Sequence, residues 1–320
     1  MSGFAPVLNV LARILLGFGL MFLVPMAWAW ALDAPELRDV WLTGMLLTLA
    51  AGSLTLFLTS QSKRELQPRD GFLLANLVWS VLPVFAAVPL LLAIDGLSFT
   101  DAYFEAMSGL TATGSTVLSG LDNLPVSVNV WRCFLQLVGG LGIMLLVVAV
   151  LPMLGLGGVQ LYKAETPGPM KDARLTPRIA ETARGLWGIY FVFSAACLLS
   201  YRWVGMSWAD AFIHMCSTMG LGGSSSHDAS FGYWNSPGIE MVATVFMALS
   251  GISFARYFIV WRSRSGVSLI RDAEVRAYGF VLLVSILGLT WLLMAQGDFT
   301  DFFTTLRTAA FHVVSVATTT

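Results

Sequence analysis

The chain has 320 residues, of which 57% are hydrophobic and only 12% are charged, and its formal net charge at pH 7 is −1. A soluble globular domain carries about a quarter charged residues, so this composition, with a mean hydropathy of +0.76, excludes an ordinary soluble domain and indicates an integral membrane protein. No nucleic acid is expected as a partner.

Seven apolar segments are long enough to cross a bilayer as helices, which takes roughly 17 to 25 residues. They are residues 8–31, 38–60, 71–94, 127–151, 185–204, 237–261 and 277–296. The first could instead be a signal peptide that ends near Ala27 to Ala29, but such a peptide has an apolar core of only about 7 to 15 residues. We therefore expect a retained first helix.

Basic residues gather in three linkers between these segments. Twelve of the 18 lie there: Lys63, Arg64, Arg69, Lys163, Lys171, Arg174, Arg178, Arg184, Arg262, Arg264, Arg271 and Arg276. The alternate linkers carry acidic residues instead: Asp95, Asp101, Glu105, Asp122, Asp210, Asp228, Asp298 and Asp301. Because basic loops stay in the cytoplasm, we predict a cytoplasmic N-terminus and an acidic outer face that attracts cations.

A short pattern occurs three times between the apolar segments. Residues 101–114 align without a gap with residues 210–223, shifted by 109, and residues 308–320 align with the second copy, shifted by 98. Fixed-period self-similarity indicates one structural unit used repeatedly. Since each copy lies between spans, it is predicted to be a re-entrant loop that enters the membrane from outside.

The predicted fold class is an all-α integral membrane protein. It consists of repeated helix, pore loop, helix units around a central pore axis, as in a K⁺ channel, preceded by two extra transmembrane helices. The predicted boundaries are 1–64 for those two helices, 65–155 for the first repeat, 156–265 for the second, and 266–320 for a third with only its first helix and loop.

Small Thr, Ser and Gly residues end each repeated loop and can present backbone carbonyls to an ion. Ser98 and Ser207 each precede an acidic residue by three positions, which predicts a short helix start. The C-terminal end of such a helix carries about half a negative charge, and carbonyl rings can replace the hydration shell of a cation. The candidate filter residues are Thr111, Ala112, Thr113, Gly114, Gly220, Leu221, Gly222, Gly223, Thr318, Thr319 and Thr320.

Three ionisable residues share one register of the repeat, namely Glu105, His214 and His312. They could titrate within the pore, but buried polar groups must be satisfied, so we predict that they brace the filter from behind. His227 and Asp228 follow the second loop, and such a pair is expected to be a loop contact rather than a metal site.

Glycines and cysteines in the apolar segments are predicted to serve packing. The glycines within residues 139–142 favour close helix contact, with a hinge as the alternative, and Ser250 with Gly251 holds a similar place in the next unit. The three cysteines, which form no CxxC pair, are Cys133, Cys197 and Cys216. They are expected to be small buried hydrophobes rather than disulfides or transition-metal ligands.

Four motifs resemble one family. Residues 108–114, 136–142, 222–228 and 310–320 are similar to the pore-forming membrane subunit of the bacterial Trk potassium uptake system, within the Trk/Ktr/HKT superfamily. The resemblance implies four helix-loop-helix units around one K⁺ pathway, a homodimer in the inner membrane, and gating by a cytosolic nucleotide-binding (NAD or ATP) subunit. It makes Gly114 and Gly223 the filter glycines, with Gly222 adjacent, and Thr320 would precede the third.

The chain departs from the family pattern in two places. Ser224 stands where an aromatic residue is common, which predicts looser packing behind the second filter. The sequence ends at Thr320, before the third filter glycine and a fourth unit. An incomplete pore exposes filter backbone to lipid at several kcal/mol per unsatisfied group, so these residues are expected to be a fragment that does not conduct alone.

Other functions remain open at this point. Passage of Na⁺ rather than K⁺ through the same pore is a close alternative. In the superfamily, Ser in place of a filter Gly favours Na⁺. This chain has Gly at both complete filter positions, which favours K⁺. Parallel repeats also occur in secondary transporters of small solutes, but these loops offer mainly backbone. An intramembrane enzyme using Ser225 with His227, or His214 with Asp210, lacks an oriented third group and an oxyanion hole.

Partners are expected on the cytoplasmic side. No phosphate-binding or dinucleotide motif follows a predicted strand, so the chain itself is predicted to bind no nucleotide. The basic linkers at 160–184 and 262–276 are candidate docking surfaces for the regulatory subunit. The alternative is that they only set topology and contact anionic membrane lipid.

Overall fold

The computed structural model describes residues 4–61, 68–153, 175–297 and 301–320, and within these ranges every regular element is a helix. The helices are α1 (Ala5–Met21), α2 (Leu23–Leu32), α3 (Glu36–Thr59), α4 (Pro68–Ala93), α5 (Phe99–Leu110), α6 (Val126–Met153), α8 (Leu175–Trp203), α9 (Trp208–Gly220), α10 (Pro237–Ser250), α11 (Phe254–Ser263), α12 (Val267–Arg271), α13 (Ala273–Gln296) and α14 (Phe302–Thr318), with the short 3-10 turns η1 (Leu121–Asn123) and η3 (Ser230–Tyr233). The predicted all-α fold is confirmed.

Most of the predicted spans are continuous helices. Within the described ranges, five segments are long and apolar enough to cross a membrane: Ala5–Leu32, Glu36–Thr59, Arg69–Ala93, Thr182–Trp203 and Ala273–Gln296. Helix α6 covers the span predicted at 127–151. Several residues of the charge argument lie outside the described residues, namely Lys63, Arg64, Lys163, Lys171, Arg174 and Asp298.

The prediction of one continuous helix over residues 237–261 is wrong. The segment is two helices, α10 and α11, whose axes differ by 81°. Gly251 lies at the break, and the hydroxyls of Tyr278 and Tyr257 donate hydrogen bonds to the carbonyls of Ala248 and Leu249 at 3.2 and 2.8 Å. A helix can break inside an apolar region only where such freed backbone groups find partners, which hydropathy does not reveal.

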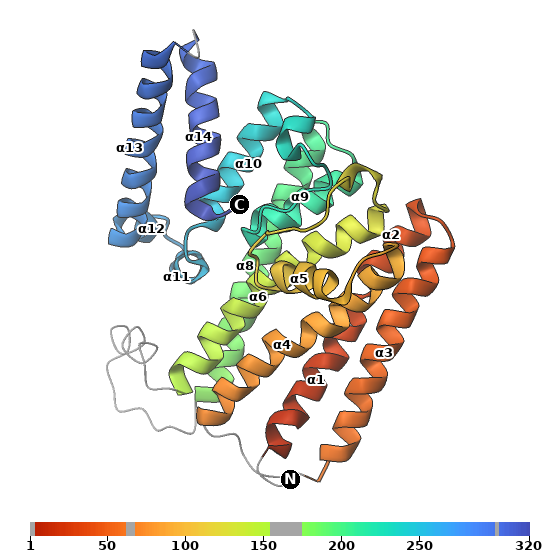
Figure 1. The fold of residues 1–320 in the computed structure, drawn as a ribbon. Coiled ribbons are helices and arrows are strands. Elements are labelled where there is room, and N and C mark those ends of the chain that lie inside the picture. The colour runs from red at the N-terminus through yellow and green to blue at the C-terminus, as the bar shows by residue number, and fades with distance from the viewer. Residues whose placement is uncertain (1–3, 62–67, 154–174, 298–300) are drawn as a thin grey trace.

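The repeated units interlock. The predicted first repeat contains helices α4, α5 and α6, the predicted second contains α8, α9, α10 and α11, and the predicted third contains α13 and α14. Each short helix packs against the span before it, as α5 on α4, α9 on α8 and α14 on α13. The exit helix of one unit also packs against the short helix of the next, in the pairs α6 with α9 and α10 with α14. This arrangement stacks the units side by side, with α13 and α14 on the flank opposite to α1 and α3 (Figure 1).

The N-terminal helices are tied to the first unit by polar contacts. The carboxylate of Asp33 accepts hydrogen bonds from the N–H groups of Val126 and Ser127, both at 2.9 Å. These are free amides at the start of α6, where a negative charge is favourable. The indole N–H of Trp41 donates to the Ser127 hydroxyl at 2.9 Å. Helices α1 to α3 thus hold the start of the first exit helix in place.

Candidate ion-binding site

The three short helices α5, α9 and α14 begin with the same kind of cap. The hydroxyls of Ser98 and Ser207 accept a hydrogen bond from the N–H of Asp101 and Asp210, each at 3.1 Å, as the sequence predicts. In the third unit the carboxylate of Asp301 takes this role and accepts from the Thr304 N–H at 2.7 Å. Such caps satisfy amides that have no partner within the helix.

The three short helices also end in the same backbone turn. One residue just beyond each helix, at the same register of the repeat, has a left-handed conformation: Ala112, Leu221 and Thr319, with φ of 52°, 55° and 61°. The next N–H donates back to a carbonyl five residues earlier: Thr113 to Ser108 at 2.9 Å, Gly222 to Ser217 at 3.1 Å, and Thr320 to Ser315 at 3.0 Å. This is the Schellman arrangement. The sequence repeat is therefore a repeat of backbone geometry.

Glycine is required two residues after the left-handed position. Gly114 and Gly223 have φ of 74° and 75°, values that L side chains rarely adopt. A Cβ built on Gly114 would lie 1.6 Å from the carbonyl oxygen of Gly222, and one on Gly223 would lie 2.7 Å from the carbonyl carbon of Thr320. The first loop therefore contacts the second, and the second contacts the third.

A buried ion pair supports the segment that follows the first loop. Glu105 accepts hydrogen bonds from the Thr116 hydroxyl and from the N–H of Val117, the latter at 2.7 Å. Its other carboxylate oxygen lies 3.1 Å from Nε of Arg132, and both side chains are 3% exposed. The Arg132 guanidinium also donates to Thr116 Oγ1 and to the side chain of Asn129. The sequence analysis did not predict this role of Arg132, whose partner Glu105 lies 27 residues away in the chain.

A neutral pair occupies the same register behind the second loop. His214 Nδ1 lies 2.9 Å from the carbonyl oxygen of Asp210, and its Nε2 lies 3.0 Å from the Ser225 hydroxyl. Because a carbonyl only accepts, Nδ1 carries the proton and Ser225 donates to Nε2. Ser225 Oγ also accepts from the N–H of His227 at 3.0 Å. The hydroxyl is buried and fully bonded, so this Ser–His contact supports a loop and does not form a nucleophile.

His312, the third residue in this register, is exposed. Its ring contacts Phe311 edge to face at a centroid distance of 5.5 Å. In the first two units the partner of this position lies 11 residues further along the chain, Thr116 for Glu105 and Ser225 for His214. For His312 that position would follow Thr320.

Gln136 of α6 links the first unit to the second loop. Its Nε2 donates to the Ser224 hydroxyl at 2.6 Å. A Cβ built on Gly222 would lie 2.3 Å from the Cδ atom of this side chain. Gln136 is fully buried. The side chain behind this loop is therefore the Gln136 amide from the preceding unit. The motif at residues 136–142 did not indicate that Gln136 would bond to Ser224.

These features define a class of protein: a multi-pass, all-α membrane protein in which repeated re-entrant loops meet between their flanking helices. Comparison with known proteins gives the family. The profile of the TrkH family, described as "Cation transport protein", matches residues 38–319. The chain belongs to this family, which confirms the resemblance and the assignment as a transporter rather than an enzyme.

Individual relatives support the assignment to this family. The Trk system potassium uptake protein TrkH of Halomonas elongata is 42% identical over 314 residues, 98% of this chain and 65% of that protein. The protein of the same name from Escherichia coli K12 is 43% identical over 272 residues, 85% of this chain and 56% of that protein. The crystal structure of the potassium transporter TrkH from Vibrio parahaemolyticus matches with a TM-score of 0.87 at 35% identity, over 98% of this chain and 64% of that one. The chain thus spans less than two thirds of the length of these relatives.

Proposed function

We propose that this chain belongs to the translocating subunit of a Trk-type system that takes up K⁺ across the bacterial inner membrane. The observation that carries the proposal is the shared backbone turn of three loops that contact one another. The names of the relatives, which are potassium uptake proteins of Trk systems, support K⁺ as the transported ion. The divisions 1–64, 65–155, 156–265 and 266–320 are the proposed structural units.

The proposed filter uses backbone carbonyls rather than charged side chains. Its residues are Thr111 to Gly114, Gly220 to Gly223, and Thr318 to Thr320. Three short helices end at these loops, so the partial negative charge of each helix end favours a cation at their meeting point. Carbonyl oxygens there would replace the hydration shell. Glu105 and His214 would brace this geometry from behind, and His312 is proposed for the same role in the third unit.

The proposed assembly is a homodimer in the membrane, with a cytosolic nucleotide-binding subunit as regulator and the N-terminus in the cytoplasm. Support comes from four arginines in one short stretch, which are all exposed: Arg262, Arg264, Arg271 and Arg276. An exposed cationic surface suits an acidic protein partner or anionic lipid. The other proposed docking segment, 160–184, lies mostly outside the described residues.

Substitution of the filter glycines tests the proposal in the complete protein that carries this sequence. Gly114→Ala and Gly223→Ala should each lower the uptake ratio of K⁺ to Na⁺ by about tenfold, which corresponds to about 1.4 kcal/mol of differential binding. Gly188→Ala is the matched control, because a Cβ there meets no atom within 4 Å. Unchanged selectivity in both filter variants would contradict the proposal, and preferred Na⁺ uptake by the unmodified protein would favour the Na⁺ alternative.

A further inference from the structure

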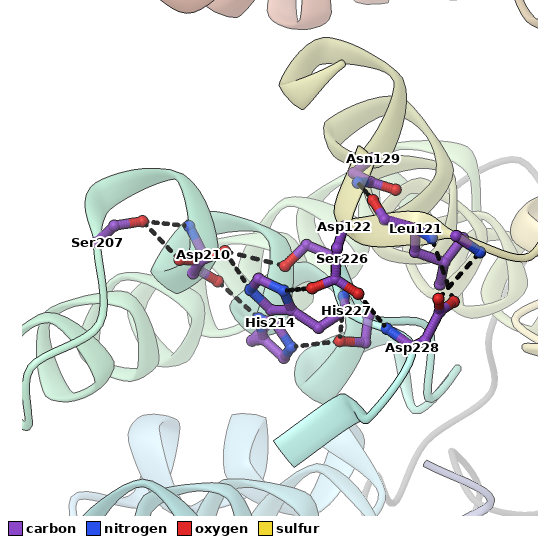
Figure 2. A network of polar contacts seen from close by, with 11 residues as sticks. Leu121, Asp122, Asn129, Ser207, Asp210, His214, Ser226, His227 and Asp228 are labelled. Atoms are coloured by element: carbon purple, nitrogen blue, oxygen red, sulfur yellow. Dashed lines mark hydrogen bonds and ion pairs between the residues drawn. The ribbon is translucent and has the colours of Figure 1, made fainter. Parts of the chain in front are cut away.

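A polar network joins the segments that follow the first and second loops (Figure 2). The carboxylate of Asp228 accepts hydrogen bonds from the N–H groups of Gly120 and Leu121 at 2.9 and 3.1 Å. In return the N–H of Asp228 donates to the carboxylate of Asp122 at 3.1 Å. The contacts are reciprocal and connect residues more than 100 positions apart in the sequence, so they fix one segment against the other.

His227 extends this network to the second short helix. Its Nδ1 bonds to the carboxylate of Asp122, and its Nε2 lies 3.4 Å from a carboxylate oxygen of Asp210 in the first turn of α9. The imidazole stacks on the ring of Tyr233 with a centroid distance of 3.6 Å and an angle of 5°. Its side chain is 14% exposed. The imidazole thus lies between two carboxylates that belong to different units.

The network is anchored at both ends by helices that surround the loops. On one side the Asn129 amide of α6 donates to the carbonyl of Leu121 at 2.9 Å. On the other side the Ser226 hydroxyl donates to Asp210 at 2.9 Å. A continuous path of contacts therefore runs from the first exit helix to the start of the second short helix.

This path is not part of the repeat. The position one repeat after Asp122 is Phe231, and the position one repeat before His227 is Leu118. Neither can form the ion pair, so the network has no counterpart related by the 109-residue shift. Glu105 and His214, which belong to the repeat, already brace the first and second loops. The network instead connects the two loops, so it can fix their positions relative to each other.

We propose that Asp122, His227 and Asp228 are positioning residues that form an outer clamp, which sets the spacing of the first and second filter loops and through it the preference for K⁺ over Na⁺. The effect on ion preference rests on the proposed function, whereas the contacts of the clamp do not. The two parts can be tested separately.

Hydrogen exchange of the complete protein tests the contacts without any transport measurement. In Asp122→Ala the Asp228 N–H and the His227 ring lose their acceptor, so the amides of residues 225–229 should exchange faster. The amides of residues 115–121 should also exchange faster, because Asp228, which accepts from Gly120 and Leu121, is then held less firmly. Asp95→Ala removes one acidic charge from an exposed residue that makes no hydrogen bond or ion pair within the described residues, and it should leave exchange unchanged. Equal exchange in both variants would overturn the clamp.

Ion selectivity tests the consequence. His227→Phe keeps a ring to stack on Tyr233 but removes both nitrogens, and it should lower the uptake ratio of K⁺ to Na⁺ by at least about threefold. The double variant with Asp122→Ala should be no worse than the stronger single variant, since residues in one network are not additive. A role in stability alone would reduce uptake of both ions together and leave their ratio unchanged, which would overturn the proposal.

A milder variant covers the case in which His227→Phe does not fold. Asp228→Asn keeps one acceptor oxygen for Gly120 or Leu121, so it should fold and lower the ratio in the same direction by a smaller factor. An unchanged ratio in Asp228→Asn, together with faster exchange at residues 115–121, would show that the clamp exists but does not set selectivity. Failure of the unmodified protein to prefer K⁺ would count against the proposed function, while the exchange result would still decide the contacts.

Discussion

The first and second loops share one backbone turn but differ in what lies behind it. Behind the first, Glu105 and Arg132 form a buried ion pair. Behind the second, His214 and Ser225 form a neutral hydrogen bond. The repeat has kept the position from which a side chain reaches the segment after the loop, but not the charge of that side chain. Backbone geometry is therefore the property that the two units have in common.

The two braces should respond differently to substitution. A buried ion pair overcomes a large desolvation cost, so removal of one partner leaves an uncompensated charge and costs about 3 to 5 kcal/mol. Loss of one partner from a neutral buried hydrogen bond costs about 1 to 3 kcal/mol. The first loop thus depends on a charge balance that the second does not need.

The largest expected effect is that of Arg132→Met. This variant leaves the Glu105 carboxylate buried without its cation and should lower the free energy of unfolding by about 3 to 5 kcal/mol. His214→Leu should cost less, about 1 to 3 kcal/mol. Thermal unfolding of the purified protein in detergent measures both. The proposed difference between the braces is wrong if the His214 variant is the less stable of the two, or if Glu105→Gln added to Arg132→Met recovers no stability.

A second prediction concerns α6, which lies against both loops. A Cβ on Gly139 would come within 2.0 Å of the Leu110 carbonyl oxygen, whereas one on Gly142 would meet only the Trp79 ring at 3.6 Å. Gly139→Ala should therefore cost about 1 to 3 kcal/mol through overpacking against rigid backbone, and Gly142→Ala should be nearly neutral. Melting temperatures that are equal for the two variants would contradict this expectation.

The third prediction concerns the hydrogen bond behind the second loop. Ser224→Ala leaves the buried amide of Gln136 without its partner and should cost about 1 to 3 kcal/mol. Adding Gln136→Leu replaces both partners by apolar groups, so the double variant should be more stable than Ser224→Ala alone. Chemical unfolding of the three proteins checks the order. A double variant that is less stable than either single one would show that the hydrogen bond is not the reason for the cost.

The smallest expected effect is a dependence on acid. The hydrogen bond from His227, followed by that from the Asp228 N–H, holds the pKa of Asp122 below its ordinary value of 3.8. The ionised carboxylate thus favours the folded protein above that value, and the contribution is lost as the pH falls through the lower folded pKa. The difference in melting temperature between the unmodified protein and Asp122→Ala should therefore shrink as the pH is lowered from about 5 to about 3. Asp95→Ala should show no such trend, and a difference that stays constant over this range would contradict the prediction.

Several parts of the fold could be predicted because they depend on local sequence. The spans follow from apolar length, the helix starts follow from Ser98 and Ser207, and the loops follow from the repeat. Each of these features is encoded within a few residues or by a fixed shift along the chain.

Other parts could not be predicted because they depend on partners far away in the sequence. The bend at Gly251 relies on hydroxyls from Tyr257 and Tyr278. The contacts of Gln136 with Ser224 and of His227 with Asp122 join different units. A repeat shows which positions are equivalent, but it does not show which side chains meet between units.

Backbone oxygens of the converging loops are central to the proposed function, because they are expected to bind the transported cation directly. Crystals of the complete protein grown with Rb⁺ in place of K⁺ would locate the ion by its anomalous scattering. We predict a peak in contact with backbone oxygens of residues 111–114 and 220–223. A well-ordered filter without such a peak, or an ion held instead by side-chain carboxylates elsewhere in the protein, would contradict this prediction.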